Sequence, residues 1–363
     1  MRVLMTADTI GGVWTYALAL ASGLSRLGIE VHLATMGRFP NAAQRAGARR
    51  VDGLVLHASD FRLCWMDASG GDLRRAGRWL LRLLRRTRPD LVHLNDFGHG
   101  GLPWPLPVVL VGHSCVLSWW QAVHGCPAPA SWNGYRLLVR RALERADAVV
   151  APTGAMGTAL TGLYGVRPPV QVIPNGLPAP RDAVPAPKEP LILAAGRLWD
   201  QAKNVAALAE VADHLPWPVA VAGEGAGAGG RGALRLLGAL SPQDLAERYQ
   251  SASIFALPAR YEPFGLAALE AAGRGCALVL GDIPSLREVW DDAALFVPPD
   301  DRRRLHAALS ALIEDPVLRR RYAARAAERA RGYSLRRMTI GYARTYDRLL
   351  SCPRASGAVP VPV

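Results

Sequence analysis

The stretch that decides the fold is Arg260-Tyr261-Glu262-Pro263-Phe264-Gly265-Leu266-Ala267-Ala268-Leu269-Glu270. It places Glu262 and Glu270, with seven residues between them, on either side of a Pro-Phe-Gly turn. Pro263 fixes its own φ, Gly265 lets the backbone come close to a ligand, and residues 266–272 have the composition of a helix. Because the first amides of a helix lack partners and carry partial positive charge, this turn predicts a site for a diphosphate.

The flanking segments favour a binding site over the alternative, which is a strand, a turn and an amphipathic helix with two solvated glutamates. Residues 253–258 predict a buried strand that leads into the turn, and residues 275–282 contain the strand that follows the helix. Ligands of open α/β sheets bind outside the carboxyl ends of the strands. Glu262 is therefore expected in a loop beside the ligand, and Glu270 two turns into the helix.

The use of lysine gives a second signal. The chain has 43 Lys plus Arg, but only Lys188 and Lys203 are lysine. Lys203 lies six residues after Arg197, beyond a predicted strand at 191–195. Arginine offers a bidentate fork and lysine a compact point charge, so the two are not interchangeable around a phosphate. This pair predicts a phosphate site, with a surface ammonium that caps a helix as the alternative for Lys203.

Strands and helices are predicted to alternate, which is typical of parallel sheets covered on both faces. Two series of strands are expected, 3–7, 31–35, 51–57, 91–94, 108–111 and 148–151, then 191–195, 219–222, 234–237, 254–257, 277–280 and 294–297. A stretch with six prolines separates the series. We expect an α/β protein with Rossmann-like domains at 1–173 and 191–335, a proline-rich linker at 174–190, a helix at 336–350 and a disordered tail at 351–363.

Composition fits an enzyme with two cores. At roughly 100–200 residues per domain, 363 residues predict two domains, and half of the residues are hydrophobic. No run of about 18 uncharged apolar residues occurs, and Met1 is followed almost directly by a strand, so neither a membrane span nor a signal peptide is expected. Five cysteines without a Cys-x-x-Cys pair indicate a reducing cytoplasm.

Two further loops follow predicted strands. Gly11 and Gly12 open a helix after the first strand and permit close approach of a phosphate or sugar, although a tight turn is the alternative. His113 follows the strand at 108–111. It could instead be a structural hydrogen-bonding residue, or a zinc ligand with Cys115, His124 and Cys126, but the one-residue gaps do not match the usual spacing of zinc sites. The loop at Gly11 and Gly12 does not form a Gly-x-Gly-x-x-Gly motif, and no Walker Gly-Lys-Ser/Thr occurs in the chain.

Charge is concentrated on two predicted helices. The net charge is +13, and arginines interleave with apolar residues at 74–88 and 136–145. These helices could form a solvated face, make reversible contact with anionic membrane, or bind nucleic acid. No nucleic-acid-binding motif is recognisable, so no nucleic-acid partner is expected.

The order of these motifs resembles that of a retaining glycosyltransferase of family 4, which has the two-domain architecture called GT-B. The resemblance covers nearly all of residues 1–350. It implies two parallel sheets that face each other across a cleft, with the helix at 336–350 crossing back onto the first domain. It also implies a nucleotide-sugar donor, with a UDP- or GDP-sugar expected, and a carbohydrate, lipid-linked or small-molecule acceptor. The motifs that carry it are the Gly-Gly loop, Val172-Ile173-Pro174-Asn175-Gly176, Ala195-Gly196-Arg197-Leu198, Lys203, the two glutamates and Tyr333-Ser334.

The resemblance implies roles for the matching residues. Arg197 and Lys203 would neutralise the diphosphate, Glu262 and His113 would lie near the reacting carbon, and Glu270 would contact the ribose. The other donor-binding residues implied are Gly11, Gly12, Gly223, Leu240, Pro263, Phe264, Gly265 and Leu266. The glycine-rich run around Gly223 departs from the family's Gly-Asp-Gly loop by Glu224.

The acceptor side and the need for a metal are predicted from other residues. Asp96, at the end of another predicted strand, is expected to orient the acceptor. Seven of the ten tryptophans precede the linker, and their flat faces suit sugar rings, although most could be core residues. The sequence contains no Asp-x-Asp, so no metal or other cofactor is expected, and Arg197, Lys203 and the helix near Gly265 would stabilise the leaving group.

Other functions remain open. One is a different enzyme of the same fold, such as a nucleotide-sugar epimerase or a glucan synthase. Another is a basic peripheral membrane or scaffold protein without catalysis, against which the intact set of Arg197, Lys203, Glu262 and Glu270 argues. A cytoplasmic enzyme of cell-envelope or exopolysaccharide biosynthesis is expected, with contact to the inner membrane surface as an open alternative.

Overall fold

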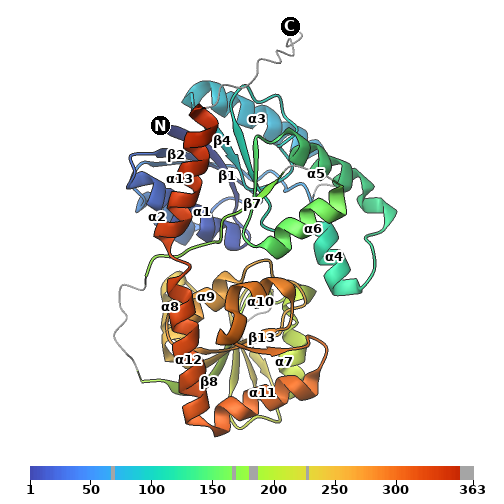
Figure 1. The fold of residues 1–363 in the computed structure, drawn as a ribbon, viewed down its shortest axis with the longest axis vertical. Coiled ribbons are helices and arrows are strands. Elements are labelled where there is room, and N and C mark those ends of the chain that lie inside the picture. The colour runs from blue at the N-terminus through green and yellow to red at the C-terminus, as the bar shows by residue number, and fades with distance from the viewer. Residues whose placement is uncertain (67–69, 166–168, 180–186, 226–228, 352–363) are drawn as a thin grey trace.

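The computed structural model describes residues 1–66, 70–165, 169–179, 187–225 and 229–351. The chain forms two seven-stranded sheets, one above the other in Figure 1. The first has the order β3-β2-β1-β4-β5-β6-β7, and the second has the order β10-β11-β9-β8-β12-β13-β14. Neighbouring strands are parallel except for β10 and β11. This is the arrangement that alternating strands and helices predict.

Helices cover both faces of the first sheet. Along β1, Val3 and Met5 pack in one core with Tyr16 of α1, whereas Leu4 packs in the opposite core with Leu80 of α3. The strands are β1 (Arg2–Asp8), β2 (Glu30–Met36), β3 (Leu54–Ala58), β4 (Leu91–Leu94), β5 (Val108–Val111), β6 (Ala148–Ala151) and β7 (Val170–Val172). The helices are α1 (Gly12–Ser25), α2 (Ala42–Arg49), α3 (Gly71–Thr87), α4 (Val116–His124), the 3₁₀ helix η1 (Ala130–Trp132), α5 (Asn133–Arg145) and α6 (Gly154–Tyr164).

The second sheet is covered in the same way. Phe255 of β12 packs in one core with Leu269 of α9, and its neighbour Ile254 packs in the other with Leu208 of α7. The strands are β8 (Glu189–Ala195), β9 (Val219–Ala222), β10 (Gly229–Arg231), β11 (Leu234–Gly238), β12 (Ala252–Leu257), β13 (Ala277–Gly281) and β14 (Leu295–Val297). The helices are η2 (Gln201–Lys203), α7 (Val205–Ala212), α8 (Pro242–Ser251), α9 (Leu266–Ala272), α10 (Pro284–Trp290), η3 (Asp291–Ala293), α11 (Arg302–Glu314), α12 (Pro316–Arg331) and α13 (Leu335–Ser351).

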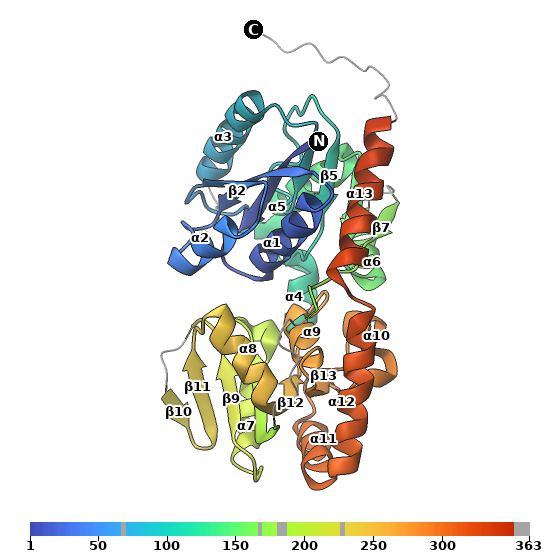
Figure 2. The ribbon, with the colours of Figure 1, turned by 90° about the vertical axis from the view of Figure 1, so that its left-hand side faces the viewer.

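The last helix, α13, packs against the first domain although α12, directly before it, belongs to the second (Figures 1 and 2). Met338, Tyr342 and Tyr346 of α13 are buried in the same core as Tyr16 of α1. Gly23 allows the close approach of the two helices, because a Cβ there would lie 1.9 Å from Oγ1 of Thr339. Among the described residues, no helix is both long and apolar enough to cross a membrane.

All twelve predicted strands are present, with boundaries that shift by a few residues. The strand predicted at 51–57 begins later, at Leu54, because Gly53 turns the chain with a φ of +67°. Two edge strands were not predicted. β7 spans only Val170–Val172, and β10 contains two glycines, so neither has the length or composition that indicates a strand. Residues 180–186 of the expected linker and 352–363 of the expected disordered tail lie outside the described residues.

Candidate active site

A cleft of about 490 Å³ lies between the two domains. Its walls include the loops that follow the carboxyl ends of β1, β4, β5, β8 and β12, which is where α/β sheets bind ligands. Most of the residues predicted for the site line it, namely Gly11, Gly12, Asp96, His113, Arg197, Lys203, Glu262, Pro263, Phe264, Gly265 and Leu266. Residues from the two halves of the sequence are thus brought to one place.

Lys203 and Glu262 form an ion pair in this cleft. Nζ of Lys203 lies 2.5 Å from Oε2 of Glu262, and the two side chains are only 14% and 16% exposed. The other carboxylate oxygen, Oε1, accepts hydrogen bonds from the amides of Gly265 at 3.0 Å and Phe264 at 3.4 Å. Burial raises the pKa of Glu262, but Lys203, the Phe264 amide and the charge of Arg197 outweigh it, so the pKa is lower than usual. Glu262 is therefore a carboxylate at neutral pH.

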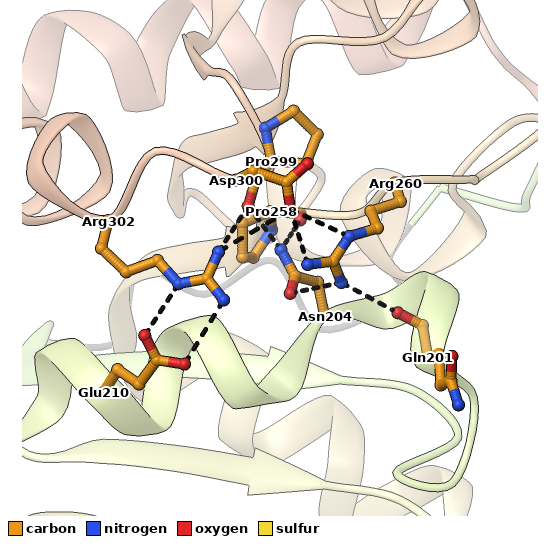
Figure 3. A network of polar contacts seen from close by, with 8 residues as sticks. All are labelled: Gln201, Asn204, Glu210, Pro258, Arg260, Pro299, Asp300 and Arg302. Carbon is orange, nitrogen blue, oxygen red and sulfur yellow. Dashed lines mark hydrogen bonds and ion pairs between the residues drawn. The ribbon is translucent and has the colours of Figure 1, made fainter. Parts of the chain in front are cut away.

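A network of polar contacts surrounds Asn204 and Arg260 (Figure 3), which lie close in sequence to Lys203 and Glu262. Asn204 follows Lys203 directly, has a left-handed φ of 55°, and donates from Nδ2 to the carbonyl oxygen of Pro258 at 2.9 Å. Nη1 of Arg260 donates to Oδ1 of Asn204 at 2.7 Å. Since Arg260 is two residues before Glu262, these bonds join the two loops that carry the ion pair. Asparagine is among the few non-glycine residues that adopt a positive φ readily.

Arg197 is held by a buried carboxylate. Nη2 of Arg197 lies 2.7 Å from Oδ2 of Asp200, whose other oxygen accepts a hydrogen bond from Nε1 of Trp119 at 2.9 Å. Burial raises the pKa of Asp200, but the hydrogen bonds from Arg197 and Trp119 outweigh it and lower the pKa. Gly11 leaves room for the guanidinium, because a Cβ there would lie 3.0 Å from Nη1 of Arg197. Gly11 was expected to let a phosphate or sugar come close to the backbone. In this structure the group that comes close to Gly11 is the guanidinium of Arg197.

The turn at Gly265 has the geometry that its composition predicts. Gly265 has a φ of +92° and lies directly before α9. The amides of Phe264 and Gly265, which directly precede α9, are bound by Glu262 in this structure. The role expected of the first amides of α9 itself, from Leu266 on, in binding a diphosphate stays a prediction.

His113 belongs to a buried hydrogen-bond network. Nδ2 of Asn95 donates to the carbonyl oxygen of Thr6, which leaves Oδ1 to accept from Nε2 of His113 at 2.8 Å and Nε2 of His93 at 3.1 Å. Burial, and then the nearby His93, lower the pKa of His113 to about 3. His113 is therefore neutral at pH 7, with the proton on Nε2 and the lone pair on Nδ1.

Two carboxylates lie on the first-domain side. Asp96 accepts from Thr6 Oγ1 at 3.2 Å and pairs with Nδ1 of His99 at 3.1 Å. Burial raises its pKa, but His99 and these hydrogen bonds outweigh it and lower the pKa. Asp8 caps its own loop by accepting from the amides of Ile10 and Gly11, while burial raises its pKa. Asp96 is thus an ionised hydrogen-bond acceptor in the cleft.

Three predicted residues are not among those that line the cleft: Gly223, Leu240 and Glu270. Gly223 packs against the backbone of Gly196, where a Cβ would lie 1.7 Å from the carbonyl oxygen. Leu240 is partly buried against the second-domain core. Burial raises the pKa of Glu270. The donor-binding roles of these three residues stay predictions.

Within the described part of the chain, no group of three or more His, Cys, Asp and Glu side chains is placed to hold a metal. His113 bonds to Asn95, and the ring of His124 packs 4.4 Å from that of Trp120. The alternative of a zinc site is therefore not supported by this geometry.

Sequence reasoning did not identify Asp200 or Tyr261 as site residues, and it considered Trp119 only as one of seven tryptophans with faces that suit a sugar ring. The hydroxyl of Tyr261 contacts the first domain, where it accepts from the amide of Cys115 at 3.2 Å and lies 2.8 Å from Oγ of Ser118. Tyr261 stands next to Glu262 in the deciding stretch, so its position was a usable signal. Asp200 and Trp119 are far apart in the sequence, and no local pattern joins them.

Two family models together match residues 10–329 of the chain. Residues 10–180 match the family model described as Glycosyltransferase Family 4, and residues 179–329 match Glycosyl transferases group 1. The D-inositol 3-phosphate glycosyltransferase of Kineococcus radiotolerans is 30% identical over 89% of this chain and 87% of its own length. The chain belongs to glycosyltransferase family 4. This family-4 glycosyltransferase is also 28% identical to the glycogen synthase of Mycobacterium tuberculosis, over 91% and 90% of the two chains.

Solved structures confirm the fold. Sucrose-phosphate synthase from Thermosynechococcus elongatus has a TM-score of 0.77 at 18% identity, with 97% of this chain and 99% of that chain covered. The Anabaena protein HepE, solved with UDP-glucose, has a TM-score of 0.75 at 17% identity, with 96% and 100% covered. The family-4 glycosyltransferase therefore has the GT-B architecture, as the sequence predicts.

Proposed function

We propose that this glycosyltransferase is a retaining enzyme that transfers a sugar from a UDP- or GDP-sugar to a carbohydrate, lipid-linked or small-molecule acceptor. The observation that carries the proposal is the placement of Arg197 and Lys203 in one cleft with the carboxylate of Glu262. Two fixed cations suit a diphosphate, which is the leaving group of such a donor. The complex of HepE with UDP-glucose supports a donor of this class.

In the proposed reaction, the acceptor oxygen bonds to the anomeric carbon on the face from which the diphosphate leaves. The bond between that carbon and the phosphate oxygen breaks, and a donor phosphate oxygen takes the acceptor's proton. Arg197 and Lys203 stabilise the charge that develops on the diphosphate, so no metal is required. His113, neutral at pH 7, accepts a hydrogen bond from a sugar hydroxyl through Nδ1.

The proposal is tested by incubating the purified protein with a panel of nucleotide sugars and measuring release of the nucleoside diphosphate without acceptor. We expect slow release from at least one donor and a roughly 10²–10³-fold loss in Lys203→Ala. Arg303→Ala, which removes an exposed cation of α11, serves as the control. With acceptor present, NMR should show the donor's anomeric configuration in the product. Failure to turn over any donor, or an inverted product, would overturn the proposal.

A second candidate is extension of a glucan, which the identity to a glycogen synthase favours. Mass spectrometry of products formed on a glucan primer distinguishes the two. Repeated additions indicate a polymerase, whereas a single addition on a small acceptor indicates the first proposal.

We also propose that the enzyme is cytoplasmic and acts in envelope or exopolysaccharide biosynthesis. In this proposal, α3 and α5 contact the anionic inner surface of the membrane. α5 carries Leu137, which is 66% exposed, among several arginines, and α3 carries arginines along its exposed side. Basic amphipathic helices bind anionic lipid surfaces. Co-sedimentation with phosphatidylglycerol vesicles but not phosphatidylcholine vesicles is expected, and equal binding to both would contradict it.

A further inference from the structure

Among the described residues, the first-domain wall of the cleft is aromatic and contains no lysine or arginine. It is formed by Leu63, Trp65, Trp119, Trp120, Trp132 and Tyr135, among others. Among the described residues that line the cleft, the only lysine or arginine side chains are Lys203 and Arg197, both on the second domain. Each is already paired with a carboxylate, Glu262 or Asp200. The segment 67–69, which lies outside the described residues next to this wall in the sequence, contains no basic residue either.

The aromatic side chains are held in fixed positions. Asp200 binds Nε1 of Trp119, and the Trp119 ring meets the Trp120 ring edge to face, with centroids 6.3 Å apart. Trp132 packs in the same way on Tyr135, with centroids 5.8 Å apart. Rigid indole faces offer a large contact area at low cost in conformational entropy. The wall is therefore a preformed binding surface.

We propose that the acceptor is an uncharged glycoside whose ring packs on Trp120 and Trp132, and not a sugar or polyol phosphate. The inference rests on the proposed function and names its acceptor class. A phosphate taken into this wall would lose water without gaining a cationic partner, which costs several kcal/mol. A neutral sugar ring has an apolar face for an indole and hydroxyl groups for a hydrogen-bond acceptor.

One polar group fits such an acceptor. Asp96 lines the cleft as an ionised carboxylate and can accept a hydrogen bond from a sugar hydroxyl group. Its negative charge repels a phosphate. The K. radiotolerans relative is named for a phosphorylated acceptor, so the proposal predicts a difference from it.

The test measures binding apart from catalysis. Intrinsic tryptophan fluorescence of the full-length protein is titrated with neutral methyl and phenyl glycosides and with inositol phosphate and sugar 6-phosphates, without donor. Trp120→Leu and Trp132→Leu are compared with Trp217→Leu, which removes a second-domain ring that packs on Arg319. Calorimetry with UDP checks that each variant keeps its donor site. Product formation is then measured for the same panel.

We expect neutral glycosides to bind and to serve as acceptors. Trp120→Leu and Trp132→Leu should weaken their binding roughly threefold to tenfold, as loss of an aromatic contact does, with UDP affinity unchanged and Trp217→Leu without effect. Tighter binding of the phosphates than of their neutral counterparts would overturn the proposal. Equal glycoside affinity in the wild type and both variants would also overturn it. Failure of donor turnover with glycoside binding intact would instead contradict the proposed function alone.

Discussion

Nζ of Lys203 lies 2.5 Å from Oε2 of Glu262 in the lining of the cleft. The lysine expected to meet a diphosphate is therefore neutralised by a carboxylate of the same site. An incoming diphosphate must compete with Glu262 for Lys203 or share it. The ion pair also keeps both side chains ordered before the donor binds, which is the preorganisation that electrostatic stabilisation requires.

Lys203→Ala should lower turnover by roughly 10²–10³. It should also lower thermal stability, because it leaves the buried carboxylate of Glu262 without its cation, and a buried charge that loses its partner typically costs about 3–5 kcal/mol. The ion pair between Lys203 and Glu262 is the reason to expect both effects. Steady-state kinetics and denaturant unfolding measure the two effects.

The double variant Lys203→Ala/Glu262→Gln separates the effect on activity from the effect on stability. It should recover much of the lost stability, since no unpaired charge is left, but none of the activity. Wild-type unfolding energy in Lys203→Ala would show that the pair adds nothing to the fold.

Stability should fall as the pH falls from about 6.5 to 3. Burial lowers the pKa of His93 and of His113 to about 3, against an ordinary value of 6.5. Between these values the unfolded chain binds more protons than the folded one, so the free energy of unfolding rises with pH by about 1.4 kcal/mol per unit for each histidine. Urea unfolding at several pH values measures how the free energy of unfolding changes with pH. His113→Gln should reduce this slope by the contribution of one histidine. An unchanged slope in His113→Gln would argue against a neutral buried imidazole.

Much of the fold follows from local patterns. Buried strands such as Val108–Val111 are continuous apolar runs, and the Pro-Phe-Gly turn is determined by proline and glycine conformations, so both were predictable. Contacts between distant residues were not. The bond between Trp119 and Asp200, and the contact of the Tyr261 hydroxyl with Ser118, depend on how the two domains meet, which no sequence spacing encodes. The predicted roles of site residues in binding a donor still require the experiments above.

Glu288→Ala should favour an open arrangement of the two domains in the unliganded enzyme. Glu288 of α10, in the second domain, accepts hydrogen bonds from the amides of Gly154 at 2.7 Å and Ala155 at 2.9 Å, at the start of α6 in the first domain. A carboxylate at a helix N-terminus contributes about 0.3–1 kcal/mol, enough to shift a balanced equilibrium severalfold. Small-angle scattering should show a larger radius of gyration in the variant. Addition of a nucleoside diphosphate should restore the wild-type value, because ligand closes the cleft. Identical scattering of both unliganded proteins would show that the hydrogen bonds of Glu288 do not hold the domains together.

Activity should survive excess EDTA. Arg197 and Lys203 supply the positive charge at the leaving group, so a divalent cation is redundant in the proposed reaction. Donor hydrolysis measured before and after dialysis against chelator, together with elemental analysis, tests this expectation. Loss of activity that returns with a specific metal would require a site that the proposal does not contain.

A nucleoside diphosphate should bind more tightly than the monophosphate, and the difference should shrink in Lys203→Ala. The second phosphate adds charge that Lys203 is placed to neutralise, whereas the nucleoside gains nothing from that ammonium. Glu270→Gln is the matched control, because Glu270 is absent from the lining of the cleft and is not expected to discriminate between the two ligands. Titration calorimetry with UDP and UMP on the three proteins gives the comparison. An undiminished difference in Lys203→Ala would mean that Glu262 retains Lys203 when the donor is bound, and would leave Arg197 as the cation that recognises the second phosphate.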